Sequence, residues 1–166
     1  PNAQPAHSLH AGWNGTRGTR FAFSLAGGVT VLPATDGSER ELAPFALVEG
    51  SLNGRHGSFA ARYSHSVSQA LGTGRIREGD SVSVSVTRSL TTWLSVFAHY
   101  GYGRSHDVFD PDFVFEVQGY EGGLRASLAR DLALIAAYVR RRASNGDAPA
   151  TVSSAAHLAL TYSKGF

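Results

Sequence analysis

The residues most able to bind a metal ion are seven histidines, because the chain contains no cysteine. They are His7, His10, His56, His65, His99, His106 and His157. No two of them have the helical His-Glu-x-x-His spacing that places two ligands on one zinc ion. We therefore predict no metal site and no cofactor. We expect these histidines to be solvated or to fill space among other polar side chains.

One stretch has residue types suited to nucleophilic chemistry. Tyr63-Ser64-His65-Ser66 resembles the Ser/His neighbourhood of outer-membrane lipid A deacylases. A Ser–His dyad needs both side chains on the same side and within hydrogen-bond reach. Adjacent residues of a strand point to opposite faces, so Ser64 and Ser66 are badly placed relative to His65. We predict no catalytic residue and no enzyme, and leave a lipid-modifying hydrolase as the one activity still open.

The segments that hold these residues have the two-residue period of β-strands. Between Asp80 and Thr87, for example, Val82, Val84 and Val86 alternate with polar residues. About eight such segments are expected, spanning residues 20–32, 43–53, 58–71, 80–87, 93–104, 113–129, 132–142 and 151–166. Their connections alternate between long and short, which is typical of outer-membrane barrels.

The sequence therefore predicts an all-β fold, an antiparallel up-and-down transmembrane β-barrel of about eight strands with short periplasmic turns and long external loops. Residues 20–166 form this barrel domain, and residues 1–19, rich in Pro, Gly and Asn, are predicted to be an N-terminal arm or linker. Within residues 113–129 the apolar residues change face near Gly119, which predicts a β-bulge there.

Two groups of side chains follow from this alternation. The charged or ionisable group is Arg20, Glu49, Arg62, His99, Glu121 and Arg125. Since eight strands leave room only for filling side chains, we predict that these residues form a polar network in the lumen. The aromatic group near the strand ends is Phe21, Trp93, Tyr100, Tyr102, Tyr120 and Tyr138. Aromatic residues concentrate at membrane interfaces, so this group is predicted to form membrane girdles.

The last segment ends on an aromatic residue and alternates large apolar with small or polar side chains. Its main residues are Leu158, Leu160, Tyr162 and Phe166. The pattern resembles the C-terminal assembly signal of bacterial outer-membrane β-barrels. The resemblance implies a bacterial outer-membrane location, with membrane lipids and the outer-membrane assembly machinery as partners.

A second resemblance covers Gly57 to Phe166. It rests on Ser58-Phe59, Tyr63-Ser64-His65-Ser66-Val67-Ser68, Asp80-Ser81-Val82, Arg88-Ser89-Leu90-Thr91-Thr92-Trp93-Leu94-Ser95 and the terminal strand. These stretches resemble an acidobacteria-like group of outer-membrane barrels of unassigned function. Members are often longer, so one alternative is that the chain is the C-terminal part of a larger porin-like barrel. The resemblance implies no catalytic residue.

Composition limits the remaining function classes. A formal net charge of +2 over 166 residues gives no basic patch for nucleic acid. No run reaches the roughly 18 apolar residues of a membrane helix. No signal peptide is visible, so we interpret the chain as mature or trimmed. The predicted function is a structural anchor, a surface-loop display or a narrow passive channel, with homo-oligomerisation left open. A soluble secreted lipocalin-like binding barrel is the other alternative.

Overall fold

A computed structural model describes residues 7–31, 42–69, 76–107, 110, 112–146 and 148–162. Its strands are β1 (His7–Arg17), β2 (Phe21–Val31), β3 (Leu42–Gly54), β4 (Gly57–Gln69), β5 (Ile76–Ser89), β6 (Leu94–Asp107), β7 (Val114–Ala129), β8 (Leu132–Asn145) and β9 (Thr151–Tyr162). The described ranges contain no helix long and apolar enough to cross a membrane.

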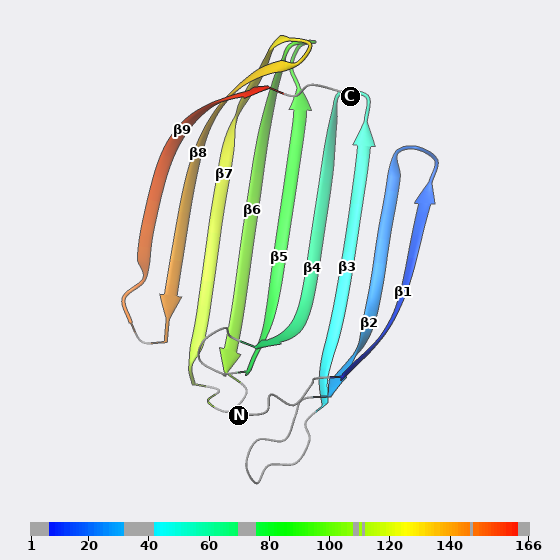
Figure 1. Cartoon of the computed structure of the whole chain (residues 1–166), viewed down its shortest axis with the longest axis vertical. Helices are drawn as coiled ribbons and strands as arrows, with labels where there is room; N and C mark the ends of the chain where they lie inside the picture. Colours follow the sequence, from blue (N-terminus) through cyan, green and yellow to red (C-terminus); the bar gives the residue numbers. More distant parts are fainter. Residues whose placement is uncertain are drawn as a thin grey trace.

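The strands form one sheet in which each strand pairs with its neighbours in sequence (Figure 1). Every pairing is antiparallel, from β1 with β2 to β8 with β9. The connections after β1, β3, β5 and β7 are short and meet at one end of the sheet, and the longer connections meet at the other. We call these the turn end and the loop end. The predicted all-β, antiparallel up-and-down topology is confirmed.

The sheet has nine strands, one more than expected, and β1 lies within residues predicted to be an arm or linker. All of β1 pairs with β2, from His7 opposite Val31 to Arg17 opposite Phe21. Its alternation is weak because Gly12, Asn14 and Gly15 are typical of turns. The turn that follows needs Gly18, whose φ of +63° lies in the left-handed region that favours glycine.

The predicted β-bulge near Gly119 is absent from β7 as the structure describes it. The register with β8 runs without a break from Phe115 to Ser127, and the irregularity lies between Ser127 and Ala129. Phe115 and Val117 therefore share a face with Gly119 and with the charged residues farther along β7. The sequence misled here because two apolar residues stand on the otherwise polar parity.

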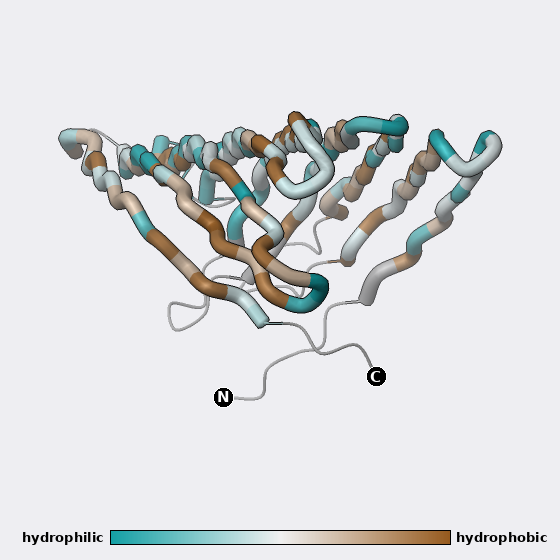
Figure 2. Tube along the Cα trace, turned by 90° about the horizontal axis from the view of Figure 1, so that it is seen from above, coloured by the Kyte–Doolittle hydropathy of each residue, from teal (hydrophilic) through white to brown (hydrophobic). Residues whose placement is uncertain are grey.

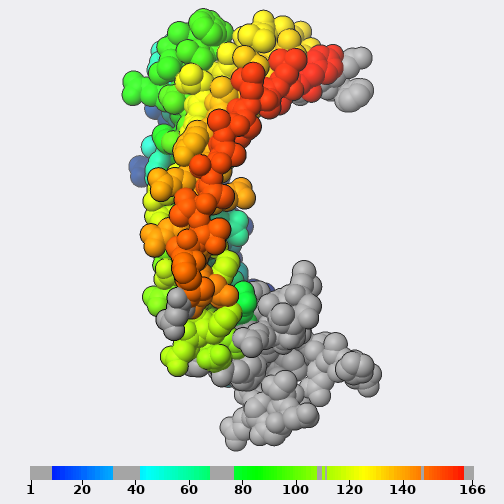
Figure 3. Space-filling model, turned by 90° about the vertical axis from the view of Figure 1, so that its left-hand side faces the viewer, coloured from blue at the N-terminus to red at the C-terminus, as the bar shows by residue number. Residues whose placement is uncertain are grey.

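The sheet is curved and open. Seen along the strands it forms a trough with β1 and β9 at its two rims (Figure 2), and from the side its turn end bends over toward one side (Figure 3). In the sheet order β1 and β9 are the two edges and do not pair with each other. The expected closure into a barrel is therefore not seen in the described part of the chain.

Candidate functional site

Register decides which side chains share a face, because directly opposed residues of an antiparallel pair point the same way. One row across the sheet is Ser24, Glu49, Arg62, Ser83, Gly101, Gly119, Arg141 and Ser153. A row on the other side is Trp13, Leu25, Val48, Tyr63, Val82 and Tyr102. We call these two sides the polar face and the apolar face.

The apolar face carries the exposed large hydrophobic residues. Leu9, Trp13, Leu25, Val86 and Leu160 are examples, and in regularly paired strand positions every exposed large hydrophobic residue lies on this face. Among the described residues the buried hydrophobic side chains are only alanines. A water-soluble domain of this length is expected to bury large apolar side chains in a core. The apolar face therefore needs an apolar environment outside the sheet.

The polar face is the concave side. Its hollows are shallow, and two of them measure about 320 and 360 Å³. The first is lined by Glu49 and Arg62 together with small residues of β2 to β5. The second contains His99, Glu121 and Arg141 around the glycines of β6 and β7. Small side chains on this face leave space beside the charged ones.

The structure brings together some of the residues predicted to form a lumen network. Glu49 and Arg62 form an ion pair with an N–O distance of 3.1 Å. His99 lies directly opposite Glu121 in the register. Arg125 lies nearer the turn end, opposite Ser95, and Arg20 belongs to the turn between β1 and β2. Within the described ranges no ion pair joins His99, Glu121 or Arg125 to another residue.

The polar face also holds a group that the sequence did not single out. The Arg77 guanidinium lies 5.7 Å from the ring centroids of both Phe113 and Phe115, a distance typical of cation–π contacts. Arg77 is directly opposite Asp107, which is only 2% exposed. The only sequence signal for this group was Phe115 on the polar parity.

The predicted girdle residues share the apolar face, apart from Trp93, which is exposed in the turn before β6. The rings of Tyr100 and Tyr120 lie 5.3 Å apart on neighbouring strands. Leu158, Leu160 and Tyr162 of the predicted assembly signal are exposed on the same face. Phe166 lies outside the described residues.

The tyrosines follow a line that is oblique to the strands. From Tyr63 on β4, the register leads across to Tyr102 on β6 and Arg142 on β8. Tyr138, the girdle residue of β8, lies four residues along the strand from Arg142. Four strand-to-strand steps lead from β4 to β8, so the line of tyrosines shifts by about one residue per strand. One residue per strand corresponds to a tilt of roughly 35°, given about 3.3 Å per residue and about 4.8 Å between strands. Strands of β-barrels are tilted by about 35–45°.

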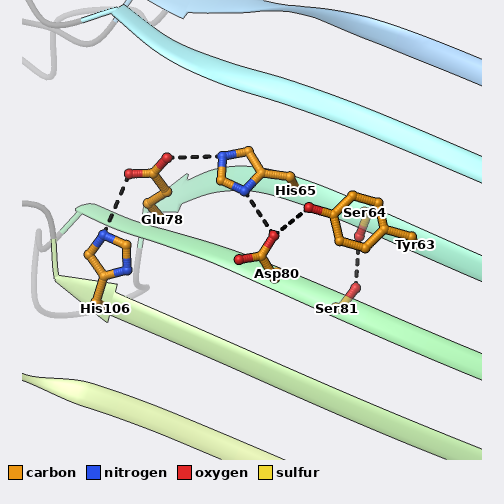
Figure 4. A network of polar contacts seen from close by, with 7 residues as sticks. All are labelled: Tyr63, Ser64, His65, Glu78, Asp80, Ser81 and His106. Atoms are coloured by element: carbon orange, nitrogen blue, oxygen red, sulfur yellow. Dashed lines mark hydrogen bonds and ion pairs between the residues drawn. The ribbon is translucent and has the colours of Figure 1, made fainter.

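Beyond this line, the loop end of the apolar face becomes polar (Figure 4). We call Tyr63, His65, Glu78, Asp80 and His106 the loop-end network. His65 bonds to Asp80 through Nδ1 at 3.0 Å and to Glu78 through Nε2 at 2.9 Å. The hydrogen bond donated by the Tyr63 hydroxyl, and next that of His65, lower the pKa of the Asp80 carboxyl. The sequence alone does not reveal this network, because Glu78 and Asp80 stand 13 and 15 positions from His65 and meet it only through the register of β4 with β5.

The stretch considered for nucleophilic chemistry is divided between the two faces. Ser64 points to the polar face, where its Oγ lies 2.7 Å from that of Ser81. His65 points to the apolar face and contacts two carboxylates (Figure 4). The two side chains therefore do not form a dyad.

No protein-family model matches the sequence, and no curated protein sequence matches it. A solved structure of similar fold is the outer-membrane expressed OmpT of Vibrio cholerae, with a TM-score of 0.64 and 13% sequence identity. The match covers 95% of this chain and 56% of that chain. The chain thus has an all-β, antiparallel up-and-down fold similar to that of an outer-membrane β-barrel, and it spans little more than half the length of that protein.

Proposed function

We propose that the chain forms part of the wall of a bacterial outer-membrane β-barrel and lines a passive channel for small polar solutes. The observation that carries this proposal is the separation of the two faces. Exposed large hydrophobic side chains occupy the convex face, and small, polar and charged side chains occupy the concave one. In a membrane barrel the first face contacts lipid and the second contacts water.

Three further observations favour this function. The oblique line of tyrosines has the tilt of barrel strands, and aromatic residues mark the edge of the apolar band. The polar face keeps hollows beside its charged groups, which favours a water-filled interior over a filled one. Leu25, Val84 and Leu160 lie on the convex face, whereas a lipocalin-like protein would turn such residues toward a ligand cavity.

The proposed barrel is larger than this sheet. Unpaired backbone groups are costly in lipid, so β1 and β9 both need a partner strand. In an antiparallel sheet of nine strands β1 and β9 run in the same direction, and joining them would create a parallel pair. Closure with only antiparallel pairs therefore needs an odd number of additional strands. The match to 56% of a longer outer-membrane protein supports the same proposal.

Membrane insertion and heat modifiability test the barrel. The protein is expected in the detergent-extracted membrane fraction, with a gel mobility that changes on heating. Recovery in the soluble fraction without detergent, and no gel shift, would refute the proposal. Solute-permeable vesicles support a channel, whereas inserted protein that leaves vesicles sealed to small sugars points to an anchor or display role.

Cysteine cross-linking tests the closure, and the natural chain has no cysteine to interfere. Ala22→Cys with Ser51→Cys is the positive control, because these residues are directly opposed on β2 and β3. Ala11→Cys on β1 with Ala156→Cys on β9 should not form a disulfide within one molecule. An efficient intramolecular disulfide at the second pair would show that β1 and β9 close directly.

A further inference from the structure

The loop-end network contains an imidazole held between two carboxylates (Figure 4). On β4, His65 lies directly opposite Asp80 of β5, and Glu78 is the next residue of β5 on the same face. Both ring nitrogens are engaged, Nδ1 with Asp80 at 3.0 Å and Nε2 with Glu78 at 2.9 Å. The side chains of His65 and Glu78 are only 20% and 26% exposed, so water replaces their contact poorly, whereas the Asp80 side chain is 51% exposed.

Counting donors shows what these contacts require. An ionised carboxylate only accepts hydrogen bonds, and a neutral imidazole carries one N–H donor and one acceptor nitrogen. With neutral His65, one ring nitrogen would present its lone pair to a carboxylate oxygen. Both contacts form only when the group holds one more proton, on the ring or on a carboxylate. We propose that His65, Glu78 and Asp80 are a proton-binding site that clamps β4 to β5 at the loop end.

Charged and titratable groups lie around His65 on the neighbouring strands. From β5 it faces Glu78 and Asp80, and from its own strand Tyr63, which donates its hydroxyl to Asp80 at 2.6 Å. From β6, His106 lies 3.5 Å from the second oxygen of Glu78, and Arg104 forms a 3.4 Å ion pair with Glu116 of β7. From β3 the residue opposite His65 is Ala46, which brings no charge.

The layout of the network favours a proton over a metal ion. The groups form a line, His106 to Glu78 to His65 to Asp80, in which each side chain contacts the next (Figure 4). A metal site needs ligands that converge on one point. In the described ranges no group of three or more histidines or carboxylates has that arrangement.

The clamp has two pH limits. At higher pH the extra proton leaves and one of the two contacts breaks. As pH falls, the carboxylates take up protons and the charge attraction is lost. The lowered pKa of Asp80 moves its part of that limit to more acidic pH. The clamp is therefore strongest in mildly acidic solution.

Glu78→Gln gives a decisive test, because the amide can donate to the acceptor nitrogen of a neutral ring. Hydrogen exchange of the β4 and β5 amides would be measured on the full chain in detergent micelles at about pH 6 and about pH 8, corrected for intrinsic rates. In the unmodified protein, protection at the loop end of β4 should fall about fivefold at the higher pH, the effect of one lost hydrogen bond. In Glu78→Gln the protection should be equal at both pH values.

A spectroscopic readout and a control complete the test. The nitrogen chemical shifts of His65 should show both ring nitrogens protonated at about pH 6 in the unmodified protein, and one in Glu78→Gln. His99→Gln, a substitution on the polar face, should leave the pH dependence of β4 unchanged. The proposal is overturned by equal pH dependence in the unmodified protein and Glu78→Gln, or by a neutral His65 ring beside two ionised carboxylates while both contacts persist.

Discussion

Ser24 and Leu25 are neighbours on β2, yet they belong to different surroundings. Ser24 lies opposite Glu49 on the polar face and lines one of its hollows. Leu25 lies opposite Val48 on the apolar face and is 39% exposed. Each face forms from alternate residues of every strand, so one backbone serves both. Position on a face, more than position in the sequence, therefore sets the tolerance to substitution.

Charge on the apolar face should have the largest effect. Leu25→Arg is expected to lower the free energy of unfolding in lipid vesicles by about 2–4 kcal/mol, the cost of a cation near the middle of the bilayer. Ser24→Arg, one residue away, should change it by less than about 1 kcal/mol, since that face would contact water in the proposed barrel. Urea titrations of both variants in vesicles measure the difference. Equal losses would remove the distinction between the faces.

Added volume gives an intermediate effect that depends on packing. A Cβ at Gly123 would lie 2.9 Å from the Cβ of Ala137 and also press on the backbone of β8, whereas a Cβ at Gly50 meets nothing within 4 Å. Gly123→Ala should cost about 1–3 kcal/mol, the usual range for overpacking. Gly50→Ala should be neutral or slightly stabilising. The same unfolding titrations decide, and a neutral Gly123→Ala would contradict the close packing of β7 on β8.

The ion pair on the polar face should have the smallest effect. The side chains of Arg62 and Glu49 are 55% and 39% exposed, so water screens their attraction. A double-mutant cycle with Arg62→Ala and Glu49→Ala should give a coupling of about 0.2–1 kcal/mol, decreasing with salt. A coupling above about 3 kcal/mol would indicate a dry, filled interior instead of the proposed channel.

The sequence predicts most of this sheet because one apolar and one polar face impose a two-residue period on each strand. Val82 to Val86 on β5 show this period clearly, and their strand was predicted. β1 was missed because glycine and asparagine weaken its alternation. Phe115 is an apolar residue on the polar face, so its place in the alternation wrongly suggested a bulge. The structure accounts for this position by the contact of Phe115 with Arg77, which the local sequence pattern does not show.

The loop-end network was not predictable in the same way. Glu78 and Asp80 lie on the apolar face of β5. From the sequence, Glu78 was expected in a loop and Asp80 at the start of a strand. Their contacts with His65 join residues 13 and 15 positions apart and depend on the exact register of β4 with β5. Closure of the barrel was not predictable either. The alternation of apolar and polar residues identifies each strand, but it does not determine how many strands complete the barrel.

The central claim is that the apolar face contacts lipid, and the fluorescence of Trp13 tests it most directly. The chain has two tryptophans, so Trp93→Phe leaves Trp13 as the single probe, 66% exposed on the apolar face of β1. In vesicles, brominated acyl chains should quench Trp13 strongly, and aqueous iodide should quench it weakly. Strong quenching by iodide with no effect of brominated lipid would contradict the account, because Trp13 would then face water.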